Sequence, residues 1–240
     1  MTDRNARSMW QPLEPIHAVT YFAPEARAAS DGAGLRGFWM GYFAQRAAPR
    51  GLLGDAIGSE SMKTAANIAW DAAPHAATAG RVLAAANQAL PEPTEPHLRL
   101  WQAATTLREH RGDGHVAVLL ANDISPVAAH HIKAAAGETD TEALRTARQW
   151  SDDEWQDGRT ALRERGWLDE AYALTIDGRQ AHNHVEEQTD RAAAQPWRVP
   201  GRDRTTALAE LLRPLAEAIV ESGVVPHPNP VGMPWPPATW

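Results

Sequence analysis

His17 and Tyr21 are the first residues whose types and spacing could do chemistry. They are four residues apart, so on a helix they share one face. Aromatic walls with a few orienting polar groups are typical of ligand sites. We interpret this face as one side of a small-molecule pocket; the alternative is a half-buried amphipathic helix with satisfied polar tips. The residues expected around the pocket are His17, Tyr21, Trp39, Tyr42, Arg108 and His115.

A second candidate for chemistry is the polar run around Gly112. Asp113 and His115 are close enough in sequence for a carboxylate to orient an imidazole, as a general base requires. Asp113 could equally cap a new helix, with Gly112 and Gly114 permitting a sharp turn. The pattern therefore leaves open a cofactorless or metal-assisted enzyme that uses His115 with Asp113. It identifies no cofactor.

Other reactive motifs are absent or out of context. The chain has no cysteine, which excludes disulfides, thiolate metal sites and cysteine nucleophiles. His130 and His131 are adjacent, and His182 and His184 are two apart, so neither pair presents two ligands on one helix face. We predict no metal site. Residues 32–37 spell GxGxxG, but they follow a predicted helix rather than a strand, so a dinucleotide site is not indicated.

The stretch from Trp150 to Arg191 predicts half of a winged helix. Ser151-Asp152-Asp153-Glu154 is a capping box that begins a helix, and Gly166 ends it. Trp167 to Thr175 are typical of a strand, a turn and a second strand, and another helix follows from Ile176. Helix, hairpin, helix is the order found in the DNA-reading half of a winged helix-turn-helix.

The expected reading helix carries charges that oppose DNA binding. Asp152, Asp153 and Glu154 favour the helix because they face the positive end of its dipole. They would also confront phosphates at close range, and the net charge of −7 argues against attachment by bulk electrostatics. DNA as a partner is therefore disfavoured. If it is bound, the expected cationic contacts are Arg159, Arg163 and Arg165.

Periodicity and chain breaks predict a mainly α fold, with a helical N-terminal bundle and a winged helix-turn-helix that has a small β-hairpin wing. A break at 111–114 should separate a helix at 96–110 from a new one that begins at His115. The last helix has an apolar stripe suited to packing or dimerisation. The expected segments are a flexible N-terminus at 1–12, a helical domain at 13–110, a winged-helix-like domain at 112–191, an amphipathic helix at 203–223 and a Pro/Trp-rich tail at 224–240.

No membrane segment is predicted from the sequence. No apolar run approaches the roughly 18 residues that a membrane span needs. The N-terminus also lacks the apolar core of a signal peptide. A cytoplasmic protein is the simplest interpretation.

Three segments carry a resemblance to a known family: residues 37–49 (GFWMGYFAQRAAP), residues 107–116 (LREHRGDGHV) and residues 150–189. Over most of 10–220 the chain resembles the actinobacterial SalK-like helix-turn-helix proteins, which often lie beside natural-product genes and have no agreed activity. The winged half is also similar to MarR-type regulators, in which a dimer reads a pseudo-palindrome. The SalK-like family has an aromatic-rich segment with a Phe-His-Pro element where this chain has only residues 50–68. A pocket wall built from that segment would therefore differ in this chain. The resemblance implies a fold, not a reaction.

The leading hypothesis is a non-enzymatic protein that binds a small aromatic or hydrophobic molecule between its two halves, in a natural-product setting. The second is a ligand-responsive, MarR-like DNA-binding transcriptional regulator, with a homodimer left open. The third is the enzyme that uses His115 with Asp113.

Overall fold

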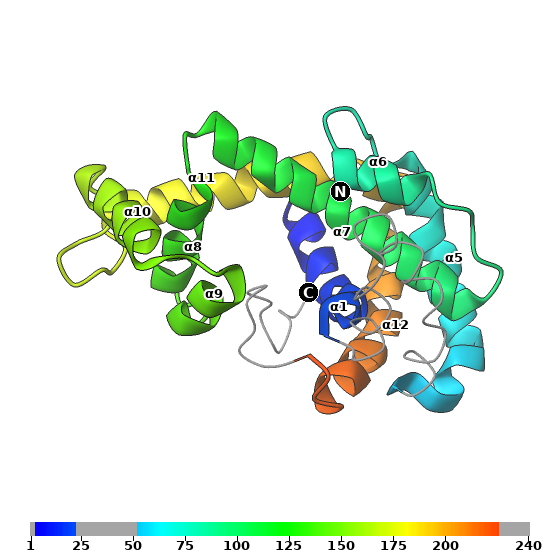
Figure 1. Cartoon of the computed structure of the whole chain (residues 1–240). Helices are drawn as coiled ribbons and strands as arrows, with labels where there is room; N and C mark the ends of the chain where they lie inside the picture. Colours follow the sequence, from blue (N-terminus) through cyan, green and yellow to red (C-terminus); the bar gives the residue numbers. More distant parts are fainter. Residues whose placement is uncertain (1–2, 23–51, 226–240) are drawn as a thin grey trace. The chain divides into compact units, whose positions relative to one another are not determined.

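The structure, a computed structural model, describes residues 3–22 and 52–225 (Figure 1). The described residues are mainly helical, as the sequence predicted. Trp39 and Tyr42, the glycine run at 32–37 and the tail from 226 onwards lie outside them.

The chain divides into two compact units, with one boundary after Asp113 and another before Ala193. Helix α7 (Pro96–Ala121) begins in the first unit and ends in the second. The other elements of the first unit are α1 (Asp3–Phe22), η1 (Gly54–Gly58), α5 (Glu60–Ala72), η2 (Ala73–His75), α6 (Val82–Gln88), η3 (Pro196–Arg198) and α12 (Gly201–Glu221). The second unit contains α8 (Pro126–Ala135), α9 (Thr141–Arg148), α10 (Asp152–Glu164) and nearly all of α11 (Ile176–Ala193).

The core of the first unit forms where α12 packs against α1 and α5. The apolar stripe of α12 is buried there, and its members Leu208, Leu212 and Ile219 are almost inaccessible to solvent. Pro214 lies inside this helix. The apolar stripe of α12 therefore serves packing within the first unit.

Helix α1 begins at Asp3, inside the segment expected to be flexible.

The core of the second unit joins the end of α7 to α8, α10 and α11. Its buried apolar residues are Val118, Ile124, Ala128, Ile132, Leu162, Leu168, Leu174 and Val185. Helices α8 and α10 pack closely at Gly158, where a Cβ atom would lie 2.7 Å from Cγ1 of Val127. A side chain at that position would force the two helices apart.

The predicted helix break at 111–114 is wrong, because α7 runs through these residues without interruption. The carboxylate of Asp113 accepts a hydrogen bond from the Ala84 N–H at 2.9 Å, so it caps α6 rather than a helix of its own. Glycine within a helix costs only about 1 kcal/mol relative to alanine. Gly114 is buried within this continuous helix.

The predicted β-hairpin wing is also wrong, since the described residues contain no strand. Residues between Trp167 and Thr175 form a tight hairpin with a single antiparallel bridge, which pairs Leu168 with Leu174. Asp169 closes the loop, because its backbone N–H donates to the Ala173 carbonyl and its carboxylate accepts from the Ala173 N–H. The residues of this turn cannot also pair as two β-strands, and Asp, Glu and Ala have low strand propensity.

Candidate functional site

A buried ionic cluster lies where α1 packs against α7 in the first unit. Arg108 on α7 places Nε 3.5 Å from Oε2 of Glu14 and Nη1 3.2 Å from Oε2 of Glu109. Both carboxylates are almost completely buried. His17 and Tyr21 follow Glu14 on α1, so the structure brings together three of the six predicted pocket residues: His17, Tyr21 and Arg108.

The hydrogen bonds of the cluster fix the tautomer of His17. The Thr105 hydroxyl donates to the Trp101 carbonyl at 2.9 Å, so it can only accept from Nδ1 of His17 at 3.1 Å. The remaining ring nitrogen, Nε2, then accepts from the Tyr21 hydroxyl at 3.0 Å. Burial lowers the pKa of His17 well below its usual value, and the charge of Arg108 acts in the same direction. His17 is therefore a neutral member of the core.

The pKa values of the acidic groups of the cluster, Glu109 and Tyr21, are raised, whereas that of His17 is lowered. Burial raises the pKa of Glu109, although Arg108 opposes the shift. Burial also raises the pKa of Tyr21 to about 12, with Arg108 opposing and Glu109 adding to the shift. The Tyr21 hydroxyl lies 3.4 Å from Oε1 of Glu109. The cluster thus holds a neutral histidine and a protonated phenol around one half-buried guanidinium.

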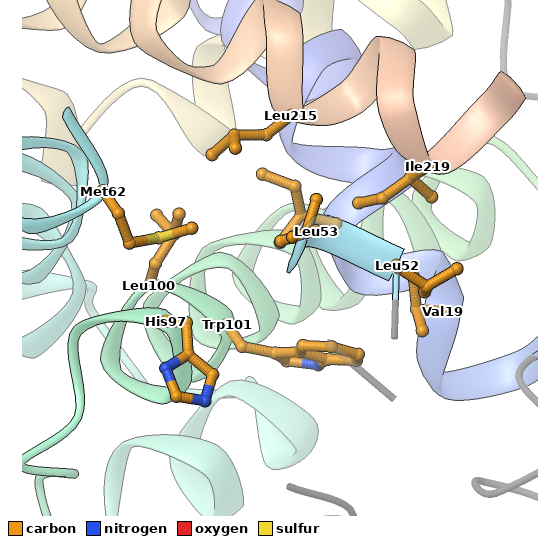
Figure 2. A pocket seen from close by; sticks show the side chains of 10 residues that line it. Val19, Leu52, Leu53, Met62, His97, Leu100, Trp101, Leu215 and Ile219 are labelled. Carbon is orange, nitrogen blue, oxygen red and sulfur yellow. The ribbon is translucent and has the colours of Figure 1, made fainter. Parts of the chain in front are cut away.

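The first unit also has an apolar cavity (Figure 2), but it is small. Figure 2 shows Met62 of α5 and Leu215 of α12 pointing toward the space around Leu53 and Leu100. The cavity volume is about 10 Å³. That is room for a single water at most, whereas ligand pockets typically span about 300–1,000 Å³. The described residues that line this cavity leave too little room for a metabolite.

His115 and Asp113 have separate partners. Nδ1 of His115 lies 3.0 Å from the Thr189 hydroxyl within the second unit, beside a cavity of about 20 Å³ lined also by Lys133, His182 and Glu186. Asp113 belongs to the first unit and caps α6. Side chains two residues apart on a helix point to nearly opposite sides. The geometry therefore gives no support to an Asp113–His115 catalytic pair.

The other histidines position helices in the second unit. The Trp150 indole N–H donates to Nδ1 of His130 at 2.9 Å, and Nε2 of His131 donates to the Trp155 carbonyl at 2.8 Å. The pKa of His130 is lowered to about 4, chiefly by burial, with the charges of Arg148 and Lys133 acting in the same direction. Within residues 3–22 and 52–225, no three acidic or histidine side chains are arranged to hold a metal ion. None of the helices in these ranges combines the length and apolarity of a membrane span.

Helices α9 and α10 form a helix-turn-helix in the second unit. Three residues connect them, and Gln149 turns the chain with a left-handed φ of 56°. The predicted capping box at the start of α10 is confirmed: the Ser151 hydroxyl accepts from the Glu154 N–H, and the Glu154 carboxylate accepts from the Ser151 N–H. Trp155, Gly158 and Leu162 face the core, so the opposite face of α10 is exposed.

The structure gives partners to two of the four acidic residues in the first turns of α10. Asp152 forms an ion pair with Arg145 of α9. Glu154 is held by Ser151, and those hydrogen bonds lower the pKa of its carboxyl. Asp153 and Asp157 are exposed. Arg145 therefore offsets the charge of Asp152, whereas Glu154 stays ionised and exposed, so the start of α10 remains anionic.

The three arginines of the expected DNA-contact set have different environments. Arg165 donates to the carbonyls of Asn122 and Asp123 at 3.2 and 2.6 Å, and its guanidinium carbon lies 3.9 Å from the Trp167 ring centroid. It therefore stabilises the end of α7. The guanidinium carbon of Arg159 lies 3.5 Å from the Tyr172 ring centroid. Arg163 is exposed.

Two further residues, not predicted from the sequence, lie on the exposed side of α10. Gln156 and Thr160 are exposed, and with Arg163 they follow the spacing i, i+4, i+7 along one side of the helix. The signal was present in the sequence, because these positions alternate with the apolar residues that face the core. Gln156, Thr160 and Arg163 are called the α10 stripe below.

A helix, a three-residue turn and a capped second helix give the second unit the form of a helix-turn-helix module. A family model described as the helix-turn-helix family matches residues 6–52 and 50–226. The chain belongs to this helix-turn-helix family. No curated protein and no solved structure matches it.

Proposed function

We propose that the protein is a DNA-binding transcriptional regulator of the ligand-responsive, MarR-like kind, acting in the cytoplasm, with α10 as its reading helix. The observation that carries the proposal is the α10 stripe: three exposed side chains able to contact bases, on the second helix of the helix-turn-helix. A glutamine amide can pair with adenine, a threonine can contact several bases, and an arginine can pair with guanine.

Charge makes this binding weak and specific rather than strong and general. Between Gly114 and Ala192 the sequence holds fifteen Asp and Glu against eight Lys and Arg, so this segment carries the whole net charge of −7. Non-specific attraction to phosphates is correspondingly small. Helix-turn-helix regulators usually overcome weak half-site binding by reading two half-sites as a dimer. A homodimer is accordingly part of the proposal.

The test is fluorescence anisotropy with labelled duplexes enriched from a random pool, first at low salt. The chain should bind saturably, and Arg163→Ala should weaken binding about ten-fold, since one good base contact contributes about 1–3 kcal/mol. Arg202→Ala is the matched control, because it removes the same charge from an exposed site on α12 of the other unit. The proposal is wrong if no duplex is bound, or if both variants lose affinity equally.

A second function is favoured by the same charge balance: a small-molecule-binding protein that does not bind DNA. The ionic cluster supports it, because Oε1 of the fully buried Glu14 has no hydrogen-bond partner. A small aromatic or hydrophobic molecule, such as the resemblance to SalK-like proteins suggests, would need more space than the apolar cavity of Figure 2 offers, and Glu14 does not line that cavity. Ligand binding must raise the melting temperature by mass action. A screen of aromatic metabolites that gives a shift without any DNA binding would favour this alternative.

A further inference from the structure

The hairpin tip of the second unit has a fixed backbone. Tyr172 has a left-handed φ of 63°, a conformation that residues with side chains rarely adopt. Its N–H donates to the Asp169 carbonyl at 3.1 Å, and the Asp169 carboxylate holds the N–H of the next residue at 3.0 Å. These bonds keep the Tyr172 ring against α10, where it stacks on Arg159.

Arg159 has a stacked face and unused donors. Its Nε is buried without a hydrogen-bond partner, and within the described ranges its guanidinium makes no hydrogen bond or ion pair. A buried donor without a partner is uncommon in folded proteins. Because Nε is shielded from solvent, a partner outside the unit can reach only the terminal Nη donors of this half-buried side chain, and the described residues supply those donors with no acceptor.

Arg165 shows what a structural arginine looks like in the same unit. It too stacks on an aromatic ring, that of Trp167, but its donors are occupied by the carbonyls of Asn122 and Asp123. The two arginines have the same chemistry and nearly the same stacking distance. Only Arg159 retains donors for a partner outside the unit.

We propose that Arg159 and Tyr172 form a clamp for one DNA phosphate, in which the Tyr172 ring holds the guanidinium plane so that its edge meets the phosphate oxygens. The inference rests on the proposed DNA-binding function and adds a contact to it. A planar guanidinium donates two parallel hydrogen bonds to a phosphate, and an aromatic face leaves those edge donors free. Tyr172 is the positioning residue: it acts on DNA only through Arg159.

The salt dependence of duplex binding tests the clamp. For each phosphate contact, the slope of log affinity against log salt concentration changes by about 0.9. Arg159→Ala and Tyr172→Ala should each make the slope shallower by about that amount, and the double variant should change it no further. Tyr172→Phe keeps the ring and should bind like the natural sequence. Arg202→Ala is again the charge-matched control and should keep the natural slope.

The outcomes separate the clamp from the proposed function. If the natural chain binds duplex but Arg159→Ala keeps its slope, the clamp is wrong and DNA binding stands. If no duplex is bound, both are wrong. Melting curves check that each variant is folded. Should Arg159→Ala fail to fold, Arg159→Lys replaces it: this variant keeps the charge but loses the plane, and unchanged binding by it would overturn the clamp.

Discussion

The carboxylate of Asp113 lies 2.9 Å from the backbone nitrogen of Ala84, and this bond caps α6 from the side of α7. The cap replaces one that α6 lacks, since no side chain within α6 or at its N-cap position serves that role. Asp113, which the sequence suggested as a catalytic carboxylate, thus links α7 to α6 instead.

Asp113→Ala should destabilise the protein by about 1 kcal/mol, the usual cost of losing a helix cap. Asp113→Asn keeps an acceptor oxygen and should cost less. Urea unfolding followed by circular dichroism measures both. Equal losses for the two variants would contradict the capping role.

Gly178→Ala should destabilise the second unit by about 3 kcal/mol, because a Cβ atom there would lie 2.1 Å from the carbonyl oxygen of Trp167. The clash is with backbone, so rotation of a side chain cannot relieve it. Gly58→Ala is the matched control, since a Cβ at Gly58 meets no atom within 4 Å. Thermal melting of both variants decides the matter, and equal melting temperatures would contradict the close approach.

The buried histidines predict a loss of stability on acidification. The pKa values of His110 and His130 are lowered to about 4, chiefly by burial, and that of His17 is also lowered. The unfolded chain therefore binds more protons between about pH 6.5 and pH 4, so the free energy of unfolding falls as the pH drops through this window. Each histidine contributes up to about 1.4 kcal/mol per pH unit. The raised pKa of Glu109 acts oppositely, because the folded state binds its proton first.

Urea titrations at several pH values from 7.5 to 4.5 measure this slope. His130→Gln should flatten it, while its effect at pH 7.5 reports only the lost hydrogen bond to Trp150. A His130→Gln variant with the natural slope would show that this histidine titrates alike in the folded and unfolded states.

Asp157→Asn should increase duplex affinity several-fold at low salt. The exposed carboxylate of Asp157 lies beside Gln156, so it repels phosphates wherever the α10 stripe meets DNA. Glu210→Gln on α12 removes the same charge from an exposed site in the other unit and should have little effect. Anisotropy titrations compare the two. If Glu210→Gln raises the affinity as much, only net charge matters and α10 is not the contact surface.

Local features of the fold were predictable from sequence. The capping box at Ser151 depends on four consecutive residues, and it forms as predicted. The shared face of His17 and Tyr21 depends only on helical spacing, and their hydrogen bond confirms it. The partner of His17 was not predictable, because Thr105 lies on another helix, 88 residues away.

The incorrect predictions share one physical cause, which is competition from contacts distant in sequence. Gly112 and Gly114 weaken an isolated helix, yet α7 is continuous through them, and Asp113 between them bonds to Ala84, 29 residues away. The partners of Arg159 and Arg165 could not be predicted from the sequence either. One stacks on a hairpin tyrosine and the other donates to the carbonyls that end α7.

The measurement that bears most directly on the proposed function is an amide chemical-shift map of the isotopically labelled chain titrated with its best-binding duplex. DNA bound through the α10 stripe should shift the resonances of Gln156, Thr160 and Arg163 most strongly, with Tyr172 at the hairpin following. Those shifts should saturate together. An unchanged spectrum, or shifts confined to α1, α5 and α12 of the first unit, would contradict the account.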